Sequence, residues 1–294
     1  MRIPILMSHG VERVASAGPE PQMTAADFAR VIAAVVDLGF ESVTYDELAA
    51  WWAGSGVLPE RPVMIDLDHP VSSMRHEVYE ILSRRGLRPT LFVNTGMLDN
   101  PDVDPRFEGT ELMSWAEVGE LARAGWCIGA HTVTHPDLSD LAVQDPSGAL
   151  VAKELDDNLA SLEAHIGVRA RDFAFTGTSW SSVAEREVKK RFRFGRLWII
   201  GSLYSADGRE IRYADLAGVP GLDEPDGGPP IAARYITRES DPYRLPSMDL
   251  QALIWETGAL RAYLEASLGR HRTTGTGSAH ERPAIVDNEA PTSR

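Results

Sequence analysis

The sequence predicts an α/β domain built on a mainly parallel sheet, and three observations favour this class. Short apolar runs typical of buried strands alternate with segments whose apolar residues recur at helical spacing. The 294 residues are enough for one α/β unit of roughly 250 residues with a remainder. A hydrophobic content of 43% against 24% charged residues supports a sizeable core and excludes a chain that is disordered or fibrous throughout.

The predicted strands are the short apolar runs that are too brief for helices. The second run ends in polar residues, which suggests that the chain leaves the core there. In chain order the runs are residues 3–7, 62–67, 90–94, 126–129, 173–175, 197–200 and 234–236.

The predicted helices begin at capping residues, and most of them end at glycines. Thr24 can cap a helix that presents one apolar face and that stops at Gly39. Thr44 and Ser114 each stand three residues before a glutamate, which is the spacing of a capping box. The other helices are expected after residue 70 up to Gly86, around residues 155–166 with leucines at helical spacing, and over about 249–268.

The remaining residues are expected to form a long loop and a tail. Residues 202–230 are rich in Gly, Pro and Asp, a composition typical of loops. The stretch after residue 268 is polar and has few large apolar residues. We therefore expect one domain over residues 1–268 and a disordered tail over residues 269–294.

Charge and cysteine content exclude several classes of protein. The 29 Lys and Arg against 43 Asp and Glu give a net charge of -14, which repels phosphate backbones and anionic membrane surfaces, so neither nucleic acid nor a membrane is an expected partner. The single cysteine, Cys127, excludes an internal disulfide framework. The amino terminus does not resemble a signal peptide, and no apolar stretch approaches the ~20 residues that cross a bilayer, so we expect a cytoplasmic protein.

Three groups of candidate catalytic residues follow predicted strands, where α/β proteins gather functional side chains. They are His9, the segment Asp66-Leu67-Asp68-His69, and the pair His131 and His135. Two imidazoles four residues apart can bind one ion if their segment is helical or a tight turn, and the middle group offers a third ligand. Two histidines and a carboxylate with one open position are typical of a hydrolytic zinc site.

The segment from Gly125 to His135 resembles the G-x-x-I-G-x-H-[ST]-x-x-H block of the polysaccharide deacetylases, carbohydrate esterase family 4. Residues 4–9 are similar to an opening P-I-L-M-x-H motif, residues 89–93 to the A-T-F-F-V strand of the family, and residues 173–177 to its later Pro/Tyr/Gly motif. The resemblance covers about residues 2–200. Four blocks in the same order are far more specific than any one of them.

The resemblance implies a distorted (β/α) barrel and a divalent metal, usually zinc, held by one aspartate and two histidines. It also implies that an aspartate acts as general base and a histidine as general acid in the hydrolysis of an N- or O-acetyl group. His131 and His135 match the metal-binding histidines. His9 matches the acid histidine of a permuted branch that acts on poly-N-acetylglucosamine. The expected enzyme is a metal-dependent deacetylase of an N-acylated amino sugar or related amide.

Two registers of the acidic motif are open, because the family usually carries T-F-D-D-G and this chain has Asp66-Leu67-Asp68-His69-Pro70. In one register Asp68 is the base and His69 replaces the aspartate that binds the metal. In the other, Asp66 is the base and Asp68 is the metal ligand. Strand alternation places the two aspartates on one face, and the second register keeps a carboxylate on the metal, so we prefer it and keep His69 as the alternative ligand.

The later motif departs from the family pattern. Ala174 stands where an arginine often braces the base, and Phe175-Thr176 replaces Pro-Tyr. Two further functions therefore stay open. One is an allantoinase-like hydrolase of small linear or cyclic amides, and the other is a catalytically degenerate carbohydrate-binding domain.

Overall fold

The computed structural model describes residues 1–12, 23–100, 103, 107, 109–177, 179–199, 234–250 and 257–269. Its strands are β1 (Ile5–Ser8), β2 (Glu41–Ser42), β3 (Pro62–Asp68), β4 (Thr90–Val93), β5 (Cys127–Ala130), β6 (Asp172–Ala174), β7 (Phe194–Ile199) and β8 (Leu245–Asp249). They pair in the order β1-β8-β7-β6-β5-β4-β3-β2, and every pairing is parallel. Because β1 also pairs with β3, all the strands except β2 close into a barrel, as the family resemblance implies.

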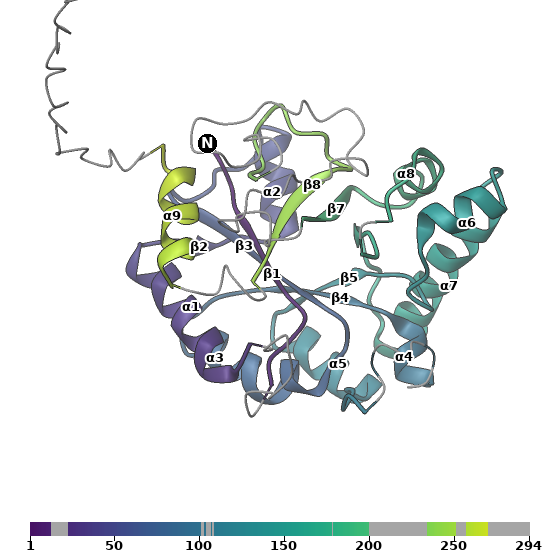
Figure 1. Ribbon diagram of the computed structural model, residues 1–294, viewed down its shortest axis with the longest axis horizontal. Coiled ribbons are helices and arrows are strands. Elements are labelled where there is room, and N and C mark those ends of the chain that lie inside the picture. The colour runs from purple at the N-terminus through teal and green to yellow at the C-terminus, as the bar shows by residue number, and fades with distance from the viewer. Residues whose placement is uncertain are drawn as a thin grey trace, which may run out of the picture.

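The helices lie around the outside of this barrel (Figure 1). They are α1 (Ala25–Asp37), α2 (Tyr45–Trp52), the π-helix η1 (Met74–Val78), α3 (Tyr79–Ser83), α4 (Thr95–Asp99), α5 (Trp115–Arg123), α6 (Leu138–Gln144), α7 (Ala149–Ile166), α8 (Ser182–Lys189) and α9 (Thr257–Ser267). The expected caps Thr24, Thr44 and Ser114 each form a complete capping box, with Asp27, Glu47 and Glu117. Among the described helices, none combines the length and the apolar character that a membrane crossing needs.

The prediction of a strand at residues 234–236 is wrong, because that segment makes only an isolated antiparallel bridge from Ile236 to Ile3. The barrel strand in this part of the chain is β8. Its sequence, Leu-Pro-Ser-Met-Asp, gave no strand signal, because it contains a proline and only two large apolar residues. The expected loop at residues 202–230 and the tail from residue 270 onward lie outside the described residues.

Strand alternation divides the core into an outer and an inner part. The outward side chains of the strands, such as Ile65 and Leu91, pack under the helices in the larger cluster. The inward ones, such as Met64 and Phe92, belong to a second cluster that fills the barrel near the start of its strands. A Cβ at Gly129 would lie 2.4 Å from the Phe92 ring, so this position on β5 admits only glycine.

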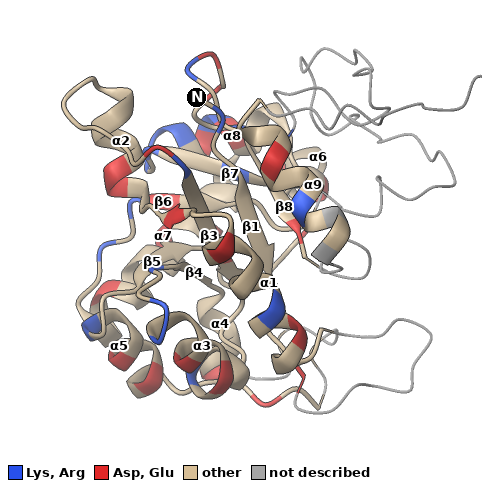
Figure 2. Cartoon of the chain, turned by 90° about the vertical axis from the view of Figure 1, so that its left-hand side faces the viewer, with Lys and Arg blue, Asp and Glu red and all other residues tan. Residues whose placement is uncertain are grey.

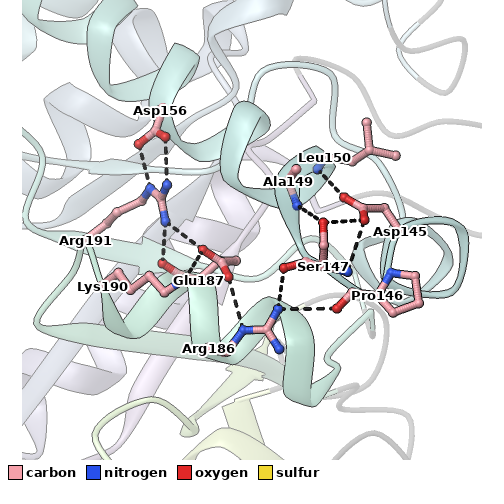
Figure 3. Close-up of polar contacts among 10 residues, drawn as sticks. All are labelled: Asp145, Pro146, Ser147, Ala149, Leu150, Asp156, Arg186, Glu187, Lys190 and Arg191. Atoms are coloured by element: carbon pink, nitrogen blue, oxygen red, sulfur yellow. Dashed lines mark hydrogen bonds and ion pairs between the residues drawn. The ribbon is translucent and has the colours of Figure 1, made fainter.

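Charged residues lie mostly on the helices and loops around the barrel (Figure 2). A set of them joins α7 to α8, and Figure 3 shows its contacts. Arg191 donates two hydrogen bonds to Asp156, at 2.6 and 2.7 Å, and a third to Glu187 at 3.2 Å. The Glu187 carboxylate is buried and also accepts from Arg186 and Lys190. Three cations thus converge on one carboxylate, and two of them also reach beyond α8: Arg191 bonds to Asp156 on α7, and Arg186 donates to the Ser147 carbonyl just before α7.

Replacing Glu187 with Gln is expected to lower the free energy of unfolding by about 2 kcal/mol, because a neutral amide cannot accept from all three cations in this buried place. Chemical denaturation measures the change. The control is Lys153→Ala, which removes an exposed ion pair with Asp157 within α7 and should leave the free energy of unfolding almost unchanged. Equal effects of the two substitutions would contradict the role given to Glu187.

Candidate metal centre and active site

A cavity of about 860 Å³ opens at the carboxyl ends of the barrel strands. Parallel strands bring residues that are far apart in the sequence to this end of the barrel. All the expected site residues except Asp66 line the cavity: they are His9, Asp68, His69, His131 and His135.

Three histidines form a compact triangle in the cavity wall. The ring centroids of His69, His131 and His135 lie 4.7 to 5.1 Å apart, and one nitrogen of each ring lies within 4.8 Å of the others. All three side chains are buried. Three converging imidazoles fit a divalent ion of the zinc type, for which histidine is a preferred ligand.

The backbone turns sharply at the positions that carry these rings. His69, Thr132 and His135 have φ values of 70°, 69° and 55°, and among the described residues they alone combine a positive φ with a side chain. Such left-handed conformations are unfavourable outside glycine and concentrate at functional sites. The turns are held by bonds from the His69 N–H to the Phe92 carbonyl and from the His135 N–H to the Thr132 hydroxyl. The left-handed positions thus lie at two of the three histidines and directly after the third, His131.

The protonation of the rings suits metal binding. Burial lowers the pKa of His131 to about 3, and burial together with His9 and His135 holds the pKa of His69 well below its usual value. Both rings are therefore neutral near pH 7. The His131 Nδ1 bonds to the carbonyl of Ala174 at 2.8 Å, so it carries the proton and leaves Nε2 free. Neutral imidazoles are the form that binds metals.

Asp68 faces this group but is held by an arginine. The fully buried Arg196, from β7, donates through Nη2 to the Asp68 Oδ1, while the Asp68 Oδ2 lies 3.9 Å from the His131 Nε2. Burial raises the pKa of Asp68, but the opposing positive charge around it, chiefly that of Arg196, holds the pKa well below its usual value. Asp68 thus presents an ionised oxygen beside the histidines, as a general base requires.

Asp66 lies deeper in the barrel and does not line the cavity. It accepts a hydrogen bond from the Tyr45 hydroxyl at 2.8 Å and lies 3.5 Å from the Arg196 Nε. Burial raises its pKa to about 7, against the opposing influence of Arg196 and Tyr45. Strand alternation places both aspartates on the inner face of β3, as expected. Asp66 does not line the cavity, and the compact group of three imidazoles contains His69 and not Asp68.

His9 lines the same cavity, and its ring stacks on the His69 ring with centroids 5.3 Å apart. Its Nδ1 lies 3.9 Å from the Asp249 Oδ2, and the same oxygen accepts a hydrogen bond from the Trp198 indole at 3.0 Å. The His9 side chain keeps 21% of its surface exposed. A partly exposed imidazole beside a buried carboxylate can carry a proton to a bound substrate.

Sequence reasoning missed four residues of this site. The arginine sought at Ala174 comes instead from Arg196, which pairs with Ala174 across the sheet on the next strand. The sequence feature that could have identified Arg196 is its position as the one charged residue within the apolar run that forms β7. Asn94 follows β4 and contacts His69, while Asp249 and Trp198 come from β8 and β7. These three carry no motif. Asn94 reaches the site because β4 pairs with β3 and β5, and Trp198 and Asp249 reach it because β7 and β8 pair next to β1.

Comparisons with known proteins agree with this architecture. The family model described as polysaccharide deacetylase matches residues 55–192. No curated protein matches the chain significantly. The fold is similar to that of the Streptococcus pyogenes deacetylase PplD in complex with acetate, with a TM-score of 0.68 and 15% identity over 90% of this chain and 99% of that one. It is also similar to IcaB from Ammonifex degensii, with a TM-score of 0.65 and 18% identity over 90% and 97% of the two chains.

Proposed function

Since the chain belongs to the polysaccharide deacetylase family, we propose that it is a metal-dependent deacetylase that hydrolyses the acetyl group of an N-acetylated amino sugar in a polymer or glycoconjugate. The observation that carries this proposal is the triangle of buried histidines with the ionised Asp68 beside it, in one cavity at the carboxyl end of the barrel. The similar structures named as deacetylases support the same reaction class.

We assign His69, His131 and His135 as the residues that would hold the metal, and zinc as the metal. Three neutral imidazoles with a remaining open position match the donor set of catalytic zinc sites. The chemistry that such an ion supplies is Lewis-acid polarisation of the acyl carbonyl and activation of water. This assignment adopts the register in which His69 replaces the aspartate ligand.

Asp68 is then free to act as general base and His9 as general acid. The Asp68 Oδ2 takes a proton from the attacking water, while Arg196 on Oδ1 keeps the carboxylate ionised and in place. His9 gives a proton to the departing amine nitrogen, so that the C–N bond breaks to leave a neutral amine and acetate. The Asp249 Oδ2 lies 3.9 Å from the His9 Nδ1 and faces the ring from β8.

The departures that suggested a degenerate binding domain have counterparts in the site. Arg196 supplies the cation that is missing at Ala174, and His69 supplies a third ligand where the second aspartate of the motif is absent. The presence of these two replacement residues favours an active enzyme over a binding domain.

Acetate release tests the proposal. We expect the zinc-loaded protein to release acetate from N-acetylglucosamine oligomers, to fall to the background rate after treatment with a chelator, and to recover when zinc is returned. Small cyclic amides serve as the parallel substrates. Hydrolysis of the cyclic amides alone would favour the allantoinase-like function, and binding of oligomers without turnover by the metal-loaded protein would favour the degenerate domain; either result contradicts the proposal.

A further inference from the structure

Asn94 is a fully buried amide that lies between the two segments carrying the three histidines. Its Oδ1 lies 2.5 Å from the His69 Nδ1. Its Nδ2 donates to the carbonyl of His131 and reaches the Thr132 hydroxyl at 3.5 Å. One side chain thus contacts the ring of one histidine and the backbone of the turn that carries the other two.

These contacts fix which nitrogen of His69 carries its proton. A carbonyl oxygen can only accept, so the Nδ2 of Asn94 must face His131 and its Oδ1 must face His69. Because Oδ1 is also only an acceptor, the His69 Nδ1 must be the donor, and the lone pair of the neutral ring is then on Nε2. The Ala174 carbonyl sets the same tautomer in His131.

We propose that Asn94 is a positioning residue that makes His69 a metal ligand in the place where a carboxylate would otherwise serve. This rests on the metal site of the proposed function. The resulting donor set is three neutral imidazoles without a carboxylate, a set that suits Zn²⁺ and Co²⁺ better than Mg²⁺ or Mn²⁺. Residues that bond to the far nitrogen of a metal-binding histidine fix its orientation, and their loss usually weakens metal binding by about 10–100-fold.

A second buried asparagine gives a matched control for a merely structural role. Asn158, on α7, donates to the carbonyls of Thr132 and Val93 at 2.5 and 2.9 Å and to the Thr95 hydroxyl at 3.2 Å. It therefore holds the same turn and the end of the same strand as Asn94. None of these three hydrogen bonds reaches a histidine ring, so Asn158→Ala disturbs the surroundings and leaves the His69 tautomer unchanged.

Zinc titration of the metal-free full-length protein tests the proposal by binding rather than by activity. We expect Asn94→Ala to bind Zn²⁺ about 10–100-fold more weakly than the wild type, and His69→Ala to bind more weakly still. The double variant should bind no more weakly than His69→Ala, because Asn94 acts through that ring. Asn158→Ala should unfold at a lower temperature and keep its zinc affinity within a few fold.

If Asn94→Ala fails to fold, Asn94→Leu takes its place in every comparison. Leucine has nearly the same shape as asparagine but makes neither hydrogen bond, so it should weaken zinc binding by about the same factor. Failure of the wild type to bind zinc would overturn the proposed function itself. With a zinc-binding wild type, the inference alone is overturned by any of three results: an unchanged affinity in Asn94→Ala, an equal loss in Asn158→Ala, or additive losses in the double variant.

Discussion

Replacing Asp68 with Asn is expected to lower kcat by about 100- to 10,000-fold while the protein keeps its zinc. An amide cannot take a proton from water, and this is the role given to the Asp68 Oδ2. The metal should stay because Asp68 bonds to Arg196 through its other oxygen and is no member of the histidine triangle. Steady-state deacetylation kinetics and zinc analysis of the same samples measure the two effects.

Asp66→Asn is the matched control for this experiment, since it makes the same chemical change two residues earlier on β3. Asp66 does not line the cavity, so we expect a much smaller loss of kcat and unchanged zinc content. The register preferred from sequence predicts the reverse: loss of zinc in Asp68→Asn and loss of turnover in Asp66→Asn. The pair of variants therefore separates the two registers.

Replacing Arg196 with Met is expected to lower the free energy of unfolding by about 3–5 kcal/mol, because it leaves two buried carboxylates without their shared cation. It should also change the pH dependence of activity. Arg196 holds the pKa of Asp68 below its usual value, so its loss raises that pKa. A base with a higher pKa is still protonated at higher pH, so the acid limb of the kcat/KM profile moves to higher pH.

Chemical denaturation and a pH profile of kcat/KM measure the two consequences. Arg196→Lys is the control, because it keeps the positive charge but loses the fork that reaches both carboxylates. It should fall between the wild type and Arg196→Met in both measurements. A variant Arg196→Met with wild-type stability and an unmoved acid limb would contradict the role given to this arginine.

Much of the fold could be predicted from sequence because the signals that start a helix or form a buried strand lie within a few neighbouring residues. The capping boxes at Thr44 and Ser114 mark helix starts that the structure confirms. The buried strands on both sides of the acidic motif appear as continuous apolar runs, as expected for a parallel sheet covered on both faces. β8 escaped prediction because its barrel pairing is nonlocal and its sequence carries a proline.

The candidate site could be predicted only where its residues stand in motifs. His131 and His135 were found by their spacing, and the structure places their rings 5.0 Å apart. The choice between Asp68 and His69 as ligand depends on the left-handed turn at His69, which has no sequence signal at a residue other than glycine. The partner of Asp68, Arg196, lies 128 residues away and meets it only in the closed barrel.

The most direct measurement of the central claim is anomalous diffraction at the zinc edge from crystals of the zinc-loaded protein. We expect one anomalous peak about 2.0–2.1 Å from a nitrogen of each of His69, His131 and His135, with both Asp68 oxygens outside bonding distance of the ion. A peak bonded to an Asp68 oxygen, with the His69 ring turned away from it, would contradict the claim.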